Sequence, residues 1–382
     1  MKNELYEDIY FDRLSKDVGY VHEDNFSFHT MELYAKISQG DQRYIYDRLN
    51  ERYGVGITIK KNWSYNHYMW VPNDYKGLRV KLVCPKEFVK DGYYSYSIRL
   101  IINPESLLRG ADAELDIFKV AANRIKRFNE VIADFVEKIC RIPIKIFSIS
   151  RIDYCFNAIF NNEEIANTYL KLLSRGDILR YNNCVEVYNH MKESAKTNMV
   201  EYEYSSFVLK AYNKRVQLED IGKKLPNGIN ACIRFEIEIG AEKIRYIMKS
   251  NGFDGRDMFL FCSSAEAERE FYRYITFHFK RGVYLNMAKA KEYIAYCVER
   301  GYIKKSAAQK LTVFIEEVSQ KRSIYMAGKE YTRPELMRML KKLEEINLNP
   351  VTIPERWNEK GKAFEYLPSI CTYLKEPAND RY

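Results

Sequence analysis

The sequence predicts an α+β protein with a mostly antiparallel sheet, followed by a helical C-terminal region. Apolar and polar residues alternate with period two in several segments before residue 240, and helical periodicity dominates from Ala265 onward. Period-two alternation is typical of strands with one buried face, whereas a period near 3.6 indicates amphipathic helices. Strands interspersed with a few helices favour the α+β class. We therefore predict three parts, with bounds 1–50 (an N-terminal segment), 51–280 (the α+β domain) and 281–382 (the helical domain).

The composition indicates a globular protein with a basic surface. The 382 residues carry a formal net charge of +9, which favours polyanionic partners and nucleic acid first. The eight cysteines form no Cys-x-x-Cys pair, so we expect reduced thiols and no zinc site. We find no apolar leader, no run of 18 apolar residues and no internal repeat, and we expect a cytoplasmic protein outside the membrane.

Individual elements follow from the same patterns. Strands are predicted within 55–59, 67–70, 78–83, 95–102 and 144–160. Helices are predicted within 31–52, 113–139, 163–175, 266–280, 289–299, 306–320 and 332–346. Ser306 and Thr332 stand at the starts of two of these helices as N-cap residues, and Pro334 and Glu335 strengthen the second start.

Two of the best strand patterns lie within residues 207–239 and carry chemically useful side chains. In the first, Lys210, Tyr212 and Lys214 share a face. In the second, Arg234, Glu236 and Glu238 oppose the apolar set. Carboxylates, a phenol and cations on one surface suit metal-assisted chemistry on a phosphodiester.

A third strand adds Arg151 and Asp153 on one face. Acidic residues on adjacent strands are oxygen ligands suited to Mg²⁺ or Mn²⁺, so Asp153, Glu236 and Glu238 are candidate metal ligands. The alternative is that each carboxylate pairs with a neighbouring cation, Arg151 or Arg234, in a salt bridge on the sheet surface. No His-x-His pair and no phosphate-binding Gly-rich loop ending in Gly-Lys-Ser/Thr is present.

Three tyrosines lie near these strands and are candidate nucleophiles: Tyr202, Tyr204 and Tyr212. A phenolate can attack phosphorus and hold DNA covalently. Because the chain has 32 tyrosines, a structural role is the alternative for each of them.

The order of these motifs resembles replication-initiation proteins of the rolling-circle type. An Arg-x-Asp strand, a Lys-x-Tyr-x-Lys strand and an Arg-x-Glu strand follow one another here as in gene II proteins of filamentous phages and Rep-like proteins of Gram-positive plasmids and integrative elements. Residues 101–104 (Ile-Ile-Asn-Pro) and 348–354 (Leu-Asn-Pro-Val-Thr-Ile-Pro) also resemble the Gram-positive group. The likeness covers roughly residues 95–355.

The resemblance implies a Rep-type, HUH-like fold, with a central antiparallel sheet flanked by helices, and a nicking reaction at an origin. In that family a tyrosine becomes joined to the 5′ phosphate, a divalent metal polarises the scissile phosphate, and the freed 3′-OH primes synthesis by the host polymerase. Carried onto this chain, Asp153, Glu236 and Glu238 would hold Mg²⁺ or Mn²⁺. Lys210 and Lys214 would offset phosphate charge.

The resemblance further implies that Arg151 and Arg234 orient the carboxylates or grip DNA. The partners it implies are origin DNA, single-stranded or in a hairpin, and a host helicase or polymerase. The helical C-terminal region would position DNA or mediate assembly, including assembly into a homo-oligomer.

The nucleophile is where the sequence departs from the family pattern. Relatives place a tyrosine in a Tyr-x-Gly-like strand just before the Lys-x-Tyr-x-Lys strand, but residues 198–206 contain no glycine. Tyr202 is then the first candidate, Tyr204 the second and Tyr212 the third. Three hypotheses follow: a metal-dependent DNA nickase that starts rolling-circle replication, a non-catalytic origin-binding initiator on the same scaffold, and a structural or regulatory phage protein.

Overall fold

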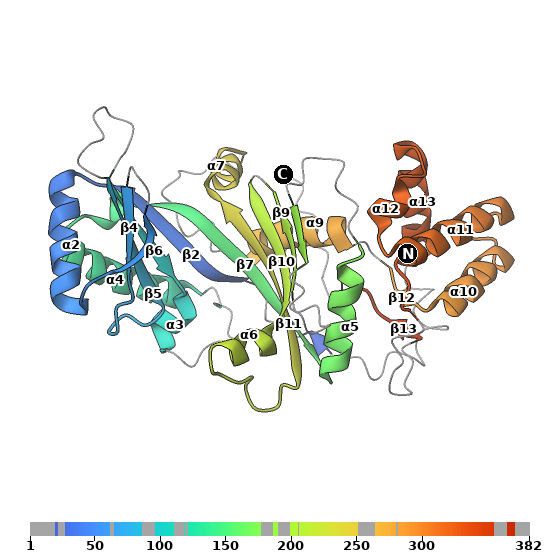
Figure 1. Cartoon of the computed structure of the whole chain (residues 1–382), viewed down its shortest axis with the longest axis horizontal. Coiled ribbons are helices and arrows are strands. Elements are labelled where there is room, and N and C mark those ends of the chain that lie inside the picture. The colour runs from blue at the N-terminus through green and yellow to red at the C-terminus, as the bar shows by residue number, and fades with distance from the viewer. Residues whose placement is uncertain are drawn as a thin grey trace.

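A large antiparallel sheet flanked by helices forms the body of the protein, and a helical region follows it, as the sequence predicts (Figure 1). We describe a computed structural model of the whole chain. It describes residues 20–21, 27–61, 65–85, 96–110, 118, 121–176, 186–189, 199–204, 206–250, 264–279, 282–354 and 365–370. The strand order of the main sheet is β3-β4-β5-β6-β2-β7-β11-β10-β9-β8, and β1 pairs with β7 beside β2.

Every strand of this sheet pairs with its neighbours in antiparallel register. The strands before residue 110 are β1 (Tyr20–Val21), β2 (Ser27–Lys36), β3 (Ile57–Lys61), β4 (Tyr65–Trp70), β5 (Leu78–Pro85) and β6 (Ser97–Ile102). The later ones are β7 (Ser148–Phe160), β8 (Glu186–Asn189), β9 (Met199–Glu203), β10 (Phe207–Asn213) and β11 (Ala231–Gly240).

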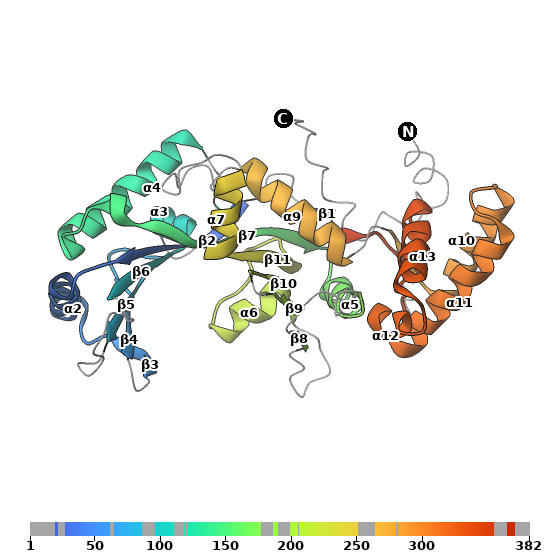
Figure 2. The same ribbon diagram turned by 90° about the horizontal axis from the view of Figure 1, so that it is seen from above.

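The helices of the sheet domain connect or follow these strands. They are α2 (Gln39–Tyr53), α3 (Pro104–Arg109), α4 (Ala122–Phe135), which continues as a π-helical turn (Val136–Cys140), a 3-10 turn (Ile144–Ile146), α5 (Glu163–Leu173), α6 (Lys214–Asp220), α7 (Ala241–Ser250) and α9 (Ser264–Phe279). Figure 2 shows α4, α7 and α9 on one side of the sheet and α6 on the other.

The sheet domain is a structural repeat that the sequence does not reveal. The order β2-α2-β3-β4-β5-β6-α3 in the first half matches β7-α5-β8-β9-β10-β11-α7 in the second, with α6 as an addition. The strand order is also the same in each half when read outward from the β2–β7 pair. Because β2 and β7 are antiparallel, the halves are related by an approximate two-fold rotation about a line through this pair, perpendicular to the sheet.

The apolar core lies on the side of the sheet that carries α4, α7 and α9. In β7 and β11 the core side chains include Ile152, Phe156, Phe235 and Ile237, all at most 1% exposed, and the rings of Phe156 and Phe235 stack with centroids 4.8 Å apart. Successive strand residues point to opposite faces, so the residues between these ones face the other side. We call that side, which carries the predicted site residues of β7, β10 and β11, the polar face.

The helical region contains α10 (Met287–Glu299), α11 (Lys305–Lys321), α12 (Ile324–Gly328) and α13 (Arg333–Glu345). The short strands β12 (Tyr284–Leu285) and β13 (Tyr366–Leu367) pair beside it. The predicted start of α13 is confirmed, because the Thr332 backbone N–H and hydroxyl both donate to Glu335 Oε2, at 3.0 and 2.6 Å. The predicted cap at Ser306 is wrong, because the N-cap residue of α11 is Lys304.

Two other expectations are corrected by the structure. The predicted helix within 31–52 begins only at Gln39, because the preceding residues belong to β2 and pair with β6 and β7. The predicted division at residue 50 therefore cuts α2 and separates β2 from its own sheet. Of the predicted 113–139 helix, residues 113–117 lie outside the described residues, and the helix is observed from Ala122.

In the described part of the chain, no helix is long and apolar enough to cross a membrane.

Gly77 offers a test of the turn that leads into β5. Its φ is +84°, and an added Cβ would lie 2.8 Å from the Asn103 carbonyl oxygen and 2.9 Å from the Leu107 nitrogen. Gly228 has a similar φ of +87° but open space around it. We expect Gly77→Ala to lower the free energy of unfolding by about 2–3 kcal/mol and Gly228→Ala by about 1 kcal/mol. Urea unfolding checks this, and equal losses would contradict it.

Candidate functional site

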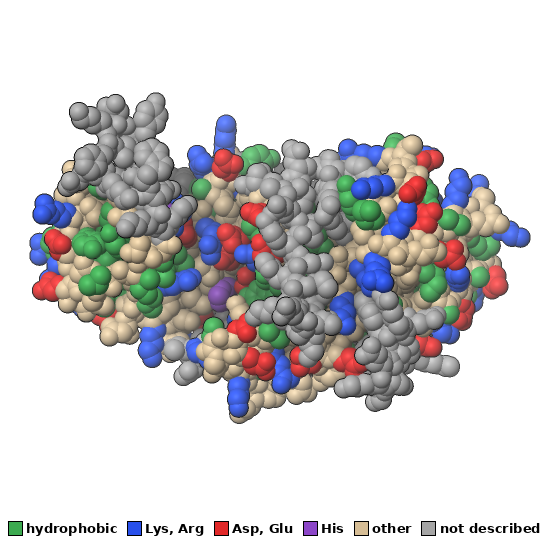
Figure 3. Space-filling view, in the orientation of Figure 1, with side chains coloured by type: hydrophobic (Ala, Val, Ile, Leu, Met, Phe, Trp, Pro, Cys, Tyr) green, Lys and Arg blue, Asp and Glu red, His purple; other side chains and the backbone are tan. Residues whose placement is uncertain are grey.

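The register of β7, β11 and β10 brings the predicted charged residues onto the polar face. Glu238 lies opposite Asp153 on one side, and Glu236 lies opposite Lys210 on the other. On the face shown in Figure 3, acidic and basic side chains gather over these central strands, next to a histidine. The structure therefore brings together three carboxylates and several cations that are up to 87 positions apart in the sequence.

Arg151 holds two of the carboxylates. Its Nε and Nη2 donate to Asp153 Oδ1 and Oδ2 at 2.9 and 2.8 Å, and its Nη1 lies 3.7 Å from Glu238 Oε1. Asp153 is only 6% exposed. Burial raises the pKa of Asp153 to about 7, even though the paired guanidinium opposes this. A bidentate pair of this kind fixes both side chains, so Arg151 orients the Asp153 carboxylate.

Tyr212 and Glu236 form the second pair. The Tyr212 hydroxyl donates to Glu236 Oε1 at 2.6 Å, and burial together with this carboxylate raises the pKa of Tyr212. Beside them, Lys210 Nζ donates to Glu238 Oε2 at 3.2 Å. Burial would lower the pKa of Lys210, but Glu238 and Glu201 raise it above its usual value, so this lysine stays charged. A phenol, a carboxylate and a cation thus lie together.

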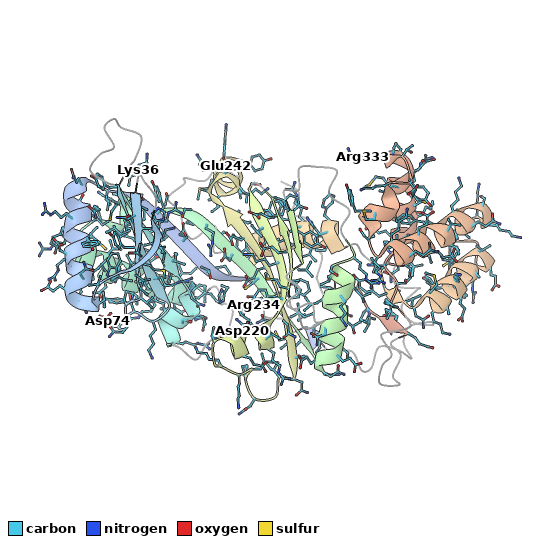
Figure 4. The ribbon with its side chains drawn as sticks, viewed as in Figure 1. Lys36, Asp74, Asp220, Arg234, Glu242 and Arg333 are labelled. Carbon is cyan, nitrogen blue, oxygen red and sulfur yellow. The ribbon has the colours of Figure 1, made fainter. Side chains whose placement is uncertain are left out.

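Two buried cations adjoin the tyrosine. Arg234 lies opposite Tyr212 and is fully buried, and its Nε donates to Asn157 Oδ1 at 2.8 Å. Figure 4 shows Arg234 close to α6, the helix that Lys214 begins. Lys214 is 5% exposed and donates to Gln217 Oε1 at 2.6 Å, and burial and Arg234 lower its pKa to about 8. Buried positive charge next to a hydroxyl favours the binding of a phosphate.

His29 belongs to this surface, although the sequence analysis did not select it. It lies at a bulge of β2, where its Nε2 is 3.0 Å from Asn103 Nδ2 and its Nδ1 is 2.9 Å from Thr30 Oγ1. Burial, and then Arg234 and Lys214, hold its pKa well below the usual value, so the ring is neutral near pH 7. The period-two alternation of β2 could have revealed this residue, but the predicted helix within 31–52 covers the second half of that strand.

Tyr202 and Tyr204 lie away from the polar face, which corrects the order of the candidate nucleophiles. Tyr202 is 1% exposed in the core, where its hydroxyl donates to the Leu173 carbonyl oxygen at 3.0 Å. The Tyr204 hydroxyl lies 2.5 Å from His278 Nε2 on α9. The alternation of β9 causes this, because Met199 and Glu201 are the residues opposite Tyr212 and Lys210. Of the three candidates, Tyr212 is the one beside the carboxylates.

The carboxylates do not fit a divalent metal ion as they are placed. Each carboxylate already accepts a hydrogen bond: Asp153 from Arg151, Glu238 from Lys210 and Glu236 from Tyr212. Over the residues that the structure describes, no three His, Cys, Asp or Glu side chains form a group able to hold a metal. The alternative of salt bridges on the sheet surface describes Asp153 and Glu238 in this arrangement. The use of Mg²⁺ or Mn²⁺ stays a prediction.

Comparisons with known proteins give limited guidance. No protein-family model matches the sequence, and no curated protein matches it. Among solved structures, the rolling circle replication initiator protein from Geobacillus stearothermophilus is similar over 59% of this chain and 79% of that chain, with 12% identity and a TM-score of 0.29. We base the functional proposal on the polar face, because a TM-score this low does not establish a shared fold.

The lowered pKa of His29 predicts a loss of stability in mild acid. Below about pH 6.5 the unfolded chain takes up a proton that the folded ring resists, so the free energy of unfolding falls as the pH falls. We expect His29→Gln, whose amide can still contact Asn103, to weaken this fall by up to about 1 kcal/mol per pH unit. Urea titrations between pH 7.5 and pH 5 measure the effect. Parallel pH profiles for the two proteins would contradict it.

Proposed function

We propose that this protein initiates rolling-circle replication of a mobile element by nicking and rejoining single-stranded origin DNA, with Tyr212 as the nucleophile. The observation that carries the proposal is the 2.6 Å hydrogen bond from Tyr212 to Glu236 among the cations Lys210, Lys214 and Arg234. A nucleophile hydrogen-bonded to its base, beside groups that offset phosphate charge, is the arrangement that phosphoryl transfer needs. The order of the sequence motifs, which resembles Rep proteins, supports the same class.

The reaction follows from these contacts. Glu236 accepts the phenolic proton while the Tyr212 oxygen forms a bond to the phosphorus of the scissile phosphodiester. The P–O3′ bond breaks, and the leaving oxygen takes up a proton to become the 3′-OH, while the 5′ phosphate stays on Tyr212. Because the pKa of Tyr212 is raised, the carboxylate has to act as the bond forms and not before it. Lys210, Lys214 and Arg234 stabilise the added negative charge.

A metal requirement is part of the proposal but not of these steps. If Mg²⁺ or Mn²⁺ is needed, a carboxylate now paired with Arg151 or Lys210 has to be released. An arriving phosphodiester competes for the same cations and offers a physical reason for that release. The proposal also includes origin DNA in the cytoplasm and a host helicase or polymerase as partners, and assembly into an oligomer. None of these enters the chemical steps above.

A second candidate function is a non-catalytic origin-binding initiator. The observation that favours it is the composition of β9, which turns Met199, Glu201 and Glu203 toward the polar face and Tyr202 toward the core. The strand that carries the nucleophile in Rep proteins thus offers no tyrosine to the polar face here. Tyr212 itself is only 7% exposed, so a strand of DNA has to come close to Glu236 to reach the Tyr212 hydroxyl.

Covalent capture of DNA decides between the two functions. With a labelled single-stranded origin oligonucleotide and Mn²⁺, we expect the wild type to form a protein–DNA adduct on a denaturing gel. Tyr212→Phe should reduce the adduct at least about a hundredfold, because it removes the attacking oxygen. Tyr202→Phe is the matched control: it loses one hydrogen bond, worth about 1 kcal/mol of stability, and keeps the adduct.

Each other outcome points to a different function. An adduct that survives in Tyr212→Phe removes Tyr212 from the reaction. Binding of origin DNA without scission by the wild type supports the non-catalytic initiator. Negligible affinity for single-stranded and duplex DNA at low salt supports the structural or regulatory phage protein, because basic contacts bind phosphate most strongly there.

A further inference from the structure

The first half of the sheet carries a second polar surface that matches the candidate site. From it we infer that β4, β5, β6 and β2 bind the single strand of DNA that extends beyond the reacting phosphodiester. The inference rests on the proposed function, since it extends the same face. We call this surface the N-terminal platform and define it by Met69, Lys81, Arg99, Tyr34 and Arg79.

The structural repeat gives the platform residues Arg99 and Lys81, and three residues beside them, counterparts in the site. When the halves are matched outward from the paired residues Met31 and Ile152, Glu32 corresponds to Asp153. On the next strand, Arg99 corresponds to Glu236 and Ile101 to Glu238. One strand further out, Lys81 corresponds to Lys210 and Val83 to Tyr212. The tyrosine and two of the three carboxylates are thus absent from these matched positions.

The substitutions leave the platform with fewer carboxylates than the site. In the site, Lys210 faces three carboxylates, whereas in the platform Lys81 and Arg99 face the single carboxylate Glu32. Glu32 is 6% exposed and already neutralised, because Arg99 Nη1 and Ser150 Oγ donate to its Oε1 at 2.6 and 2.8 Å. A surface that keeps a lysine at the position of Lys210, has Arg99 where the site has Glu236 and lacks the tyrosine can retain a phosphodiester without reacting with it.

The platform also offers surfaces for bases. Met69, Lys81, Arg99 and Tyr34 lie directly opposite one another on four adjacent strands, and the Arg99 guanidinium lies over the Tyr34 ring at 5.4 Å. The exposed Ile57 lies opposite Met69 and extends this row by one strand. Basic side chains interleaved with aromatic and apolar ones are the pattern that binds single strands, through phosphate contacts and base stacking.

The position of the row indicates one continuous strand and not a separate duplex site. Glu32 lies directly opposite Arg151, so the platform begins where the candidate site ends. With about 4.8 Å between strands, the row from β4 to β7 spans roughly 19 Å. Figure 2 shows β3 and β4 at one end of the sheet, and β8 and β9 at the other, bending toward the side of α6, which is that of the polar face. This curvature follows an extended strand better than a straight double helix.

The test compares oligonucleotides of two lengths. The variant Arg79→Gln/Lys81→Gln removes two platform charges, and Lys341→Gln/Lys342→Gln removes two exposed charges from α13 as the matched control. Fluorescence anisotropy measures the affinity for origin single strands of about six and about twenty nucleotides, lengths that bracket the usual single-strand footprint, and for a duplex of the longer length.

We expect the platform variant to bind the long strand about tenfold more weakly. The slope of log affinity against log salt should fall by about 1.4, because each lost phosphate contact contributes about 0.7. Binding of the short strand, and its adduct with Tyr212, should be unchanged in both variants. The α13 control should resemble the wild type throughout.

Two results would overturn the inference while leaving the proposed function intact. One is a platform variant that matches the wild type on both lengths while the wild type still forms the adduct. The other is a loss confined to duplex DNA, which would make the platform a double-strand surface. A wild type that binds neither length at low salt overturns the proposed function as well, so the two failures are distinguishable.

Discussion

The pairing of β2 with β7 is the constraint on which the rest of the structure depends. β2 has β6 on its other edge and β7 has β11, so this one pair joins two five-stranded halves into a single sheet. Its register places Thr30 opposite Asp153 and Glu32 opposite Arg151. A slip by one residue would turn every side chain of one half to the wrong face. The core and the polar face are therefore specified by the same set of hydrogen bonds.

Charge compensation explains why so many ionisable groups can lie on this sheet. Asp153 is nearly buried, and a buried carboxylate without a partner would cost several kcal/mol. Arg151 supplies that partner and also approaches Glu238, which Lys210 contacts from the other side. Each charge thus depends on its neighbours, so a phosphate that engages one cation changes the balance of the whole group. Such coupling suits the binding of DNA that we propose for this surface.

Much of the site could be predicted from the sequence because β7, β10 and β11 alternate clearly. Period-two patterning assigns Asp153, Glu236, Glu238 and Lys210 to the polar side of their strands, and the structure places them there. What the pattern cannot give is which strands are neighbours. β2 lies between β6 and β7 although it precedes both by many residues, so the contribution of His29 depends on long-range pairing.

Other features were missed for local reasons. α6 follows β10 directly, and its short length gives little periodicity, so Lys214 was assigned to the strand end when it begins a helix. The structural repeat left no trace in the sequence, because the two halves share alternation and strand order but few residue types at matched positions. Topology can persist in this way, since a fold requires the pattern of apolar residues more than their identities.

The parity of a strand position decides which tyrosine lies beside the carboxylates. Tyr202 lies on β9 and Tyr204 directly follows it, yet Tyr202 points into the core because Val200 and Tyr202 occupy the apolar positions of β9. Tyr212 lies on β10 opposite Arg234 and two positions after Lys210. Its side chain is therefore on the same face as that of Lys210 and reaches Glu236. In the first half of the sheet, the position that matches Tyr212 holds Val83, which has no hydroxyl to donate. One sheet can thus carry the nicking surface and the strand-binding surface that we propose side by side, because alternation fixes the face while residue identity sets the chemistry.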